Sequence, residues 1–211
     1  MNVSPSKENI LKKIRKALSQ STPLPFPQSE GNQSVFLPPQ QENEVEFAEQ
    51  FTRLQGKFIY CINQQEMAFQ LASLVKKQDW KKIFCVEDKL VAPFAAQIAD
   101  RLTKSDLAGC DVSITGCEFL VARTGSIMLS AAQASGRSAS VYAPIHICIA
   151  FTSQVVYDIR DALQGAKDKY GNHLPSLITF ATGPSRTADI EKTLVVGVHG
   201  PKEVYVFLVE A

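Results

Sequence analysis

The 211-residue chain lacks three features that would assign it to a broad class of proteins at once. Its longest apolar stretches, such as Val141–Phe151, are too short and too interrupted to cross a bilayer. The N-terminus has no apolar core or cleavage site of a signal peptide, so we expect a cytoplasmic protein. With 22 basic and 21 acidic residues, the chain has no general field that attracts nucleic acid or acidic lipid. We therefore expect neither a membrane span nor a nucleic-acid partner.

Cysteine is present, but without the spacing that metal sites need. The five cysteines are Cys61, Cys85, Cys110, Cys117 and Cys148. An odd number without a C-x-x-C pair argues against a disulfide framework, a zinc site or an iron–sulfur cluster held by this chain alone. We therefore expect no metal site on this chain, and we expect most of the thiols to pack as small hydrophobic side chains.

The N-terminal part of the chain differs in composition from the rest. Residues 5–19 are predicted to form a basic amphipathic helix, whose apolar stripe packs while its lysines are solvated. Docking of this helix on an acidic partner or a membrane face is the alternative. Residues 21–40 carry five of the eleven prolines, which is typical of an extended strap. We therefore divide the chain into an arm, 1–40, and a compact domain, 41–211.

In the compact domain, short apolar runs alternate with amphipathic segments. Helical spacing is predicted at 44–55, 67–75, 91–102 and 155–169, and strands at 58–62, 83–86, 141–151, 177–180 and 204–209. Residues 118–130 are predicted to form two strands joined at Thr124-Gly125-Ser126, without room for a helix. The alternation is typical of βαβ units, so the sequence predicts an α/β fold with a mixed, mainly parallel sheet.

Three loops are rich in Gly, Ser and Thr, a composition typical of anion sites at strand ends. They comprise residues 124–126, 135–138 and 183–187. None matches a Walker A or G-x-G-x-x-G fingerprint, so a nucleotide site of those types is not supported. The third loop is the strongest candidate, because it leads into Asp189 and Glu191, and buried acids are costly unless they are paired or serve a site.

These loops predict one anion-binding site. Residues 183–191 and 198–201 would form two walls, and 124–126 would complete it, with Arg186 holding a carboxylate or phosphate. The expected ligand-binding residues are Thr124, Gly125, Ser126, Gly183, Ser185, Arg186, Thr187, Asp189, Glu191, Gly197, His199 and Gly200. Glu118, Glu191 and His199 are weak catalytic candidates, and His146 is expected to be a core histidine. No Ser/His/Asp triad or metal-ligand spacing can be assigned.

Three strings carry a resemblance to a known family. TGPSRTADIEKTLVVGVHGP, TGCEFLVARTGSIMLS and GRSASVYAPIHICI resemble the lactate-utilisation (LUD-domain) family, and within it the short C components of bacterial L-lactate utilisation systems. The most specific part is G-P-S-x-T-x-D-I-E followed by G-V-H-G-P, and the resemblance extends from about Phe58 to the C-terminus. It implies a three-layer α/β fold similar to that of ribose-phosphate isomerases, glucosamine-phosphate deaminases and CoA transferases.

The same resemblance implies a role in oxidising L-lactate to pyruvate. Two partner proteins would hold the iron–sulfur clusters, while this chain would have no cofactor and would bind a small carboxylate or phosphate. An independent enzyme on a CoA-transferase-like scaffold, acting on a phosphate, CoA or folate-type substrate, and a regulatory or scaffold module are the alternatives. Self-association into a homo-oligomer is left open.

One position departs from the family pattern. Family members usually have an acid in the A-E-T-G-[TS] turn, where this chain has Arg123. A carboxylate nucleophile or base is therefore impossible at that position. Glu118, earlier in the same run, is the substitute that the sequence offers, although strand alternation does not establish that its carboxylate reaches the turn.

Overall fold

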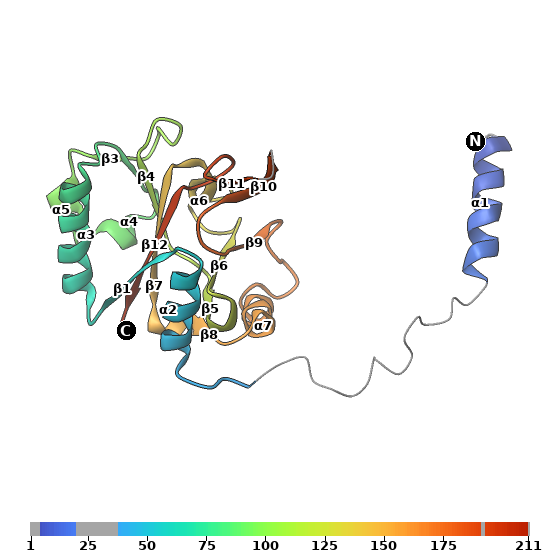
Figure 1. Cartoon of the computed structure of the whole chain (residues 1–211), viewed down its shortest axis with the longest axis horizontal. Helices are drawn as coiled ribbons and strands as arrows, with labels where there is room; N and C mark the ends of the chain where they lie inside the picture. The colour runs from blue at the N-terminus through green and yellow to red at the C-terminus, as the bar shows by residue number, and fades with distance from the viewer. Residues whose placement is uncertain (1–4, 20–37, 191–192, 211) are drawn as a thin grey trace. The chain divides into compact units, whose positions relative to one another are not determined.

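The structure is a computed structural model that describes residues 5–19, 38–190 and 193–210. Contacts divide the chain into two compact units, Met1–Pro38 and Pro39–Ala211. In the first unit, helix α1 spans Pro5–Leu18, as its apolar spacing predicts (Figure 1). Its side chains Ile10 and Ile14 are exposed.

The second unit is built around a six-stranded sheet in the order β1-β12-β7-β4-β2-β3, in which every pair is parallel (Figure 1). Its strands are β1 (Lys57–Cys61), β2 (Ile83–Phe84), β3 (Leu102–Thr103), β4 (Val112–Thr115), β7 (Ile145–Phe151) and β12 (Glu203–Val209). The three central strands are almost entirely buried, as is usual for parallel strands covered on both faces. The α/β class with a mainly parallel central sheet is therefore confirmed.

Antiparallel pairing is confined to two smaller sheets. A four-stranded sheet has the order β8-β5-β6-β9, with β5 (Phe119–Val121), β6 (Ser126–Ser130), β8 (Val155–Val156) and β9 (Ile178–Ala181). β5 and β6 form the predicted hairpin, through the 3₁₀ turn η1 (Ala122–Thr124). A second hairpin joins β10 (Arg186–Ile190) to β11 (Thr193–Val196). The run around 177–180 thus lies beside β6, outside the central sheet.

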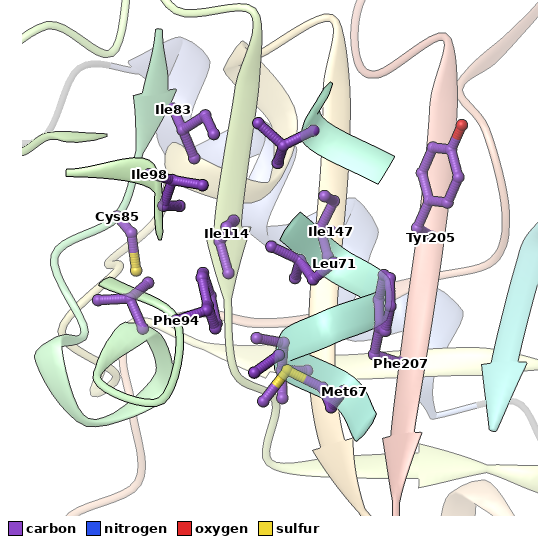
Figure 2. Packing of buried hydrophobic residues seen from close by; sticks show 14 of the residues in the cluster. Met67, Leu71, Ile83, Cys85, Phe94, Ile98, Ile114, Ile147, Tyr205 and Phe207 are labelled. Atoms are coloured by element: carbon purple, nitrogen blue, oxygen red, sulfur yellow. The ribbon is translucent and has the colours of Figure 1, made fainter. Parts of the chain in front are cut away.

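Helices cover the six-stranded sheet and the four-stranded sheet. On one face of the central sheet lie α3 (Gln64–Gln78), α4 (Asp88–Val91) and α5 (Ala95–Ile98). Leu71 of α3, Ile98 of α5 and Phe94, which lies between α4 and α5, pack in one core with Ile114 and Phe207 (Figure 2). On the other face, Phe47 and Phe51 of α2 (Asn43–Arg53) pack in a core shared by both sheets. α7 (Ile159–Tyr170) buries Ala162 and Ala166 against the four-stranded sheet.

The predicted bounds of two elements are wrong, because each predicted range contains a proline. The helix expected at 91–102 is broken into α4 and α5 around Pro93, which has no N–H for the helical ladder, and Leu102 belongs to β3. The strand expected at 141–151 begins only at Ile145, after Pro144. The residues before it form the short helix α6 (Ala139–Tyr142).

The helix predicted at 155–169 begins later than its apolar spacing suggests. Val155 and Val156 form β8, which pairs with β5, and a 3₁₀ turn η2 (Thr152–Gln154) precedes it. Asp158 then caps α7, its side chain accepting a hydrogen bond from Arg160 N. Asp is among the residues most favoured at an N-cap, so the helix begins at the residue after Asp158 and not at Val155.

Candidate functional site

Two of the three predicted loops meet at the C-terminal end of α2. Gly125 has φ +59°, and a Cβ atom there would lie 2.6 Å from the backbone nitrogen of Phe51. Gly183 has φ +76°, and its Cβ would lie 2.7 Å from the carbonyl oxygen of Leu54. Both glycines are needed, because other residues rarely adopt this backbone conformation and any side chain would collide with α2. The end of α2 therefore fixes both turns.

Arg186 completes this contact. Its Nη2 donates to Leu54 O, at 2.6 Å. The last carbonyls of a helix have no partner within the helix, and a basic side chain commonly satisfies one. Leu54, which follows α2, therefore contacts both Arg186 and Gly183.

A chain of three hydroxyl groups links the 124–126 turn to the end of β9. Thr124 Oγ1 lies 2.8 Å from Ser126 Oγ, which lies 2.8 Å from Thr182 Oγ1. Ser126 is buried, whereas Thr182 is exposed. Each hydroxyl has one donor and two acceptor positions, so the chain can present a donor or an acceptor at its exposed end.

The structure also brings the 183–187 segment against the turn after β11. Ser185 N donates to Pro201 O, and Gly197 N donates to Ser185 O, both at 2.9 Å. A Cβ atom at Gly200 would lie 2.9 Å from Ser185 Cβ, so the two segments are in van der Waals contact. His199 is exposed in this turn.

The acidic part of the predicted site is only partly described. Asp189 belongs to β10 by its backbone, and its side chain lies outside the described residues, as does all of Glu191. Thr187 is half-buried in β10. The binding role of all these residues stays a prediction.

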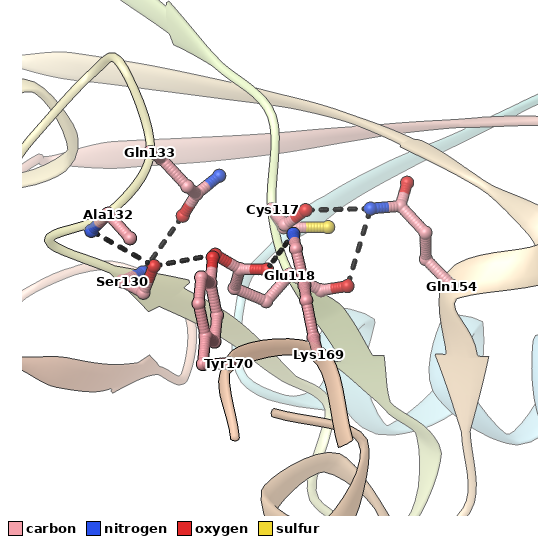
Figure 3. Close-up of polar contacts among 8 residues, drawn as sticks. All are labelled: Cys117, Glu118, Ser130, Ala132, Gln133, Gln154, Lys169 and Tyr170. Atoms are coloured by element: carbon pink, nitrogen blue, oxygen red, sulfur yellow. Dashed lines mark hydrogen bonds and ion pairs between the residues drawn. The ribbon is translucent and has the colours of Figure 1, made fainter. Parts of the chain in front are cut away.

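Glu118 lies in a separate polar cluster (Figure 3). The residue is 5 % exposed, and its carboxylate accepts hydrogen bonds from Ser130 Oγ (2.5 Å), Tyr170 OH (2.6 Å) and Lys169 Nζ (2.7 Å). Burial raises the pKa of Glu118, but the hydrogen bonds from Lys169, Ser130 and Tyr170 outweigh it, so the pKa lies below its usual value. Glu118 is therefore an ionised carboxylate that ties α7 to the β5–β6 hairpin.

This geometry limits what Glu118 can do chemically. Glu118 precedes β5 whereas the 124–126 turn follows it, so the two lie at opposite ends of the strand. A carboxylate with a lowered pKa and three donors is also a weak general base. The structure does not bring Glu118 to the predicted anion site.

Arg123 has a structural partner that sequence analysis missed. Its Nε donates to Asp158 Oδ2, while Asp158 also caps α7. Burial raises the pKa of Asp158, and the hydrogen bonds from Arg160 N and Arg123 lower it below its usual value. The signal for the cap was present, since Asp158 and Asp161 have the spacing of a capping box. Arg123 therefore links the η1 turn to α7.

A buried histidine lies at β4 and β7. His146 Nε2 lies 2.8 Å from Thr115 Oγ1, whose hydroxyl donates to Gly116 O. A hydroxyl has one hydrogen, so Nε2 donates to Thr115 and Nδ1 is the unprotonated nitrogen. Within the described residues, His146 Nδ1 and Ser113 Oγ have no hydrogen-bond partner. Burial lowers the pKa of His146 to about 4, so this core histidine is neutral.

The comparisons with known proteins identify the class of this domain. The LUD domain family matches residues 45–209, so the chain belongs to that family. This confirms the resemblance carried by the sequence motifs. Among solved structures, a DUF162 family protein from Deinococcus radiodurans aligns with a TM-score of 0.58 at 19 % identity, covering 79 % of this chain and 96 % of that one. At that identity the likeness supports the fold alone.

Curated relatives give a more particular likeness. The chain is 38 % identical over 117 residues to lactate utilization protein C of Bacillus velezensis, covering 54 % of this chain and 48 % of the relative. With the protein of the same name from Bacillus subtilis it shares 38 % over 101 residues, covering 47 % and 42 %. The chain thus spans about half the length of the curated relatives it matches.

Two further observations concern the described part of the chain. No helix there is long and apolar enough to span a membrane. Nor do three or more His, Cys, Asp or Glu side chains gather there in a way that could hold a metal ion.

Proposed function

We propose that this chain is a non-redox component of an L-lactate oxidation system, which works with iron–sulfur partner proteins and binds a small anion. Membership in the LUD domain family and the likeness to proteins named lactate utilization protein C support the system. Nothing in the cysteine spacing offers a cluster site, so the electrons of lactate would pass to the partners. The chain would contribute binding and assembly.

The observation that carries the proposal is that the 124–126 and 183–187 loops meet at the end of α2, while the turn at 197–201 contacts Ser185. The hydroxyl chain from Thr124 to Thr182 leads to Gly183, and Arg186 lies at the same end of α2. A guanidinium has five N–H donors, so a carboxylate can be held by donors other than the one that Leu54 accepts. Hydroxyl groups and one cation are groups suited to binding a small anion such as lactate, pyruvate or phosphate.

A purely structural role for Arg186 is the competing explanation. The C-terminal end of a helix carries partial negative charge, which disfavours an anion and favours a cation. Arg186 would then stabilise α2 only, and the loops would bind nothing. A ligand-binding measurement separates these roles, because only the first gives ligand-dependent stabilisation.

The test is thermal-shift screening of lactate, pyruvate, phosphate and CoA against the full chain and three variants. Arg186→Ala and Ser185→Ala should lose affinity about tenfold to a hundredfold for the ligand that stabilises the wild type, since a charge-assisted hydrogen bond contributes about 1.5–3 kcal/mol. Lys104→Ala is the matched control, because Lys104 is an exposed cation that pairs with Asp88 and lies in none of the three candidate loops. Equal stabilisation of all variants by one ligand would show that the site lies elsewhere. No stabilisation of the wild type by any of the four ligands would contradict the binding of such anions.

The partner part of the proposal is tested separately, by co-purification from the native host. The expected result is a complex with proteins that carry iron. A solitary chain that forms a covalent acyl intermediate would instead support an independent enzyme on a CoA-transferase-like scaffold.

A further inference from the structure

The open edge of the central sheet is lined with exposed apolar side chains. β1 is the last strand in the order, and among the described strands it pairs only with β12. Four large apolar side chains near this edge are solvent-exposed: Val45 on α2 (45 %), Tyr60 on β1 (43 %), Ile62 (63 %) and Phe69 on α3 (71 %). Edge backbone and apolar surface together are typical of an interaction site.

Two hollows flank β1, one on each face of the sheet. Successive side chains of a strand point to opposite faces. Phe58 and Tyr60 line a hollow of about 670 Å³ against α2. Ile59 and Phe69 line a second hollow, of about 470 Å³, against α3. A strand added to this edge would therefore place alternate side chains in the two hollows.

β1 lacks two features that commonly protect a free edge, a proline and a bulge. Natural edge strands avoid further pairing by a proline, a bulge or an outward charge. The sequence of β1, KFIYC, has no proline, and it pairs with β12 in unbroken register. The side chain of its one charged residue, Lys57, is 46 % exposed, and its Nζ donates to Glu203 (2.6 Å) and to Tyr205 OH (2.8 Å) of the neighbouring strand.

We propose that this edge is the interface of a homodimer, in which β1 of a second copy pairs antiparallel with β1 about a twofold axis. The strand is self-complementary in that arrangement. With Ile59 opposite its own copy, Phe58 of each chain faces Tyr60 of the other, and aromatic cross-strand pairs stabilise a sheet. The contact is isologous and closes at two copies.

The flanking helices fit the same symmetry. A twofold axis perpendicular to the sheet places α3 beside its own copy in antiparallel orientation. α3 carries Glu66 in its first turn and Lys76 and Lys77 in its last turn, so opposite charges meet across the axis. α2 has the same polarity, with Glu44 in its first turn and Arg53 in its last.

A segment of another protein could add a strand to β1 as well. It would not account for the exposed apolar side chains and matching end charges on both α2 and α3. We therefore assign the edge to a second copy. This inference goes beyond the proposed function and does not rest on it, since none of these residues belongs to the anion site.

The first test is sedimentation of the full chain over a range of concentrations. The wild type should be a dimer, and Phe69→Lys and Ile62→Lys should each weaken dimerisation by about tenfold or more, as expected when a charge replaces an apolar side chain that the interface buries. Leu163→Lys is the matched control, because Leu163 is 38 % exposed on α7, away from β1. Thermal melts of the variants show whether each one is folded.

The second test uses a cysteine on the axis. Facing residues of an antiparallel pair have Cα atoms about 4.5–5.5 Å apart, which is within disulfide reach. Ile59→Cys should therefore form a covalent dimer under mild oxidation, whereas Leu163→Cys should not. The five native cysteines are all buried, so they do not obscure the result. Any of three results overturns the proposal. The wild type is monomeric at every concentration, or Phe69→Lys and Ile62→Lys dimerise as the wild type does, or Ile59→Cys forms no cross-link.

Discussion

Glu118→Ala should destabilise the domain strongly, because Ser130, Tyr170 and Lys169 would all lose the carboxylate to which they donate. Ser130 is 3 % exposed, so its hydroxyl would lose a partner away from water. Hydrogen bonds to a charged group contribute about 1.5–3 kcal/mol each. Two of the three donors, Ser130 and Tyr170, are buried or half-buried and would lose such a bond, whereas Lys169 is 57 % exposed and stays solvated. We therefore expect the free energy of unfolding to fall by about 3–5 kcal/mol, measured by urea denaturation near neutral pH.

Removing the donors one at a time should give a defined order. Tyr170→Phe removes a half-buried hydroxyl from the Glu118 carboxylate and should cost about 1.5–3 kcal/mol. Lys169→Met should cost about 1 kcal/mol or less, because the lysine side chain is 57 % exposed and its charge is solvated. The burial of each donor, not its formal charge, thus determines how much its hydrogen bond contributes.

The pH dependence provides a second, independent measurement. The pKa of Glu118 is lower in the folded chain than its ordinary value of 4.5. A carboxylate of this kind stabilises the fold above its unfolded pKa, and the contribution is lost as pH falls through the folded pKa. The stability difference between wild type and Glu118→Gln should therefore shrink below pH 4.5. Parallel pH profiles, or equal costs for Lys169→Met and Tyr170→Phe, would refute this reasoning.

Two further predictions follow from the backbone and the buried histidine. Gly125→Ala should lower stability by about 2 kcal/mol or more, because it combines a positive φ with a collision against α2; Gly136→Ala, with φ +66° and open space around it, should cost about 1 kcal/mol, and equal melting temperatures would contradict the collision. His146 has a folded pKa of about 4 against an ordinary value of 6.5, so its neutral form stabilises the fold above pH 6.5 and this contribution is lost as pH falls to 4. His146→Gln should therefore lose less stability than wild type over that interval, by up to about 3 kcal/mol; a variant as acid-sensitive as wild type would argue against a buried neutral ring.

Local patterns predicted most of the elements correctly. α2, α3, β1, β12 and the β5–β6 hairpin follow from apolar spacing and turn residues, which act over a few positions. The failures have nonlocal causes. Val155 and Val156 have helical spacing, yet they form a strand because β5 offers a parallel partner 35 positions earlier in the chain. Strand order is likewise unpredictable from spacing, since it depends on which distant segments pair.

For the candidate site too, composition indicates which loops to consider, whereas only the structure shows which of them lie together. Composition singled out the loops at 124–126, 135–138 and 183–187, in which Gly, Ser and Thr gather, and the structure brings the first and third of them to the end of α2. Composition could not show that α2 supports two of them, because the contact between Arg186 and Leu54 joins residues 132 positions apart. Nor could it show that Glu118 and the 124–126 turn lie at opposite ends of β5.

The glycines of these loops show why the structure changes the argument for a ligand. In sequence, a glycine beside Ser and Thr has two explanations, a positive φ and a close approach to a bound anion. At Gly125 and Gly183 the structure supplies a positive φ and a close approach to the backbone of α2, so neither glycine requires a ligand. At Gly200 the close neighbour is Ser185 itself. The argument for an anion therefore rests on the side chains of Ser185 and Arg186, which is why the variants that test it alter those two residues and leave the glycines in place.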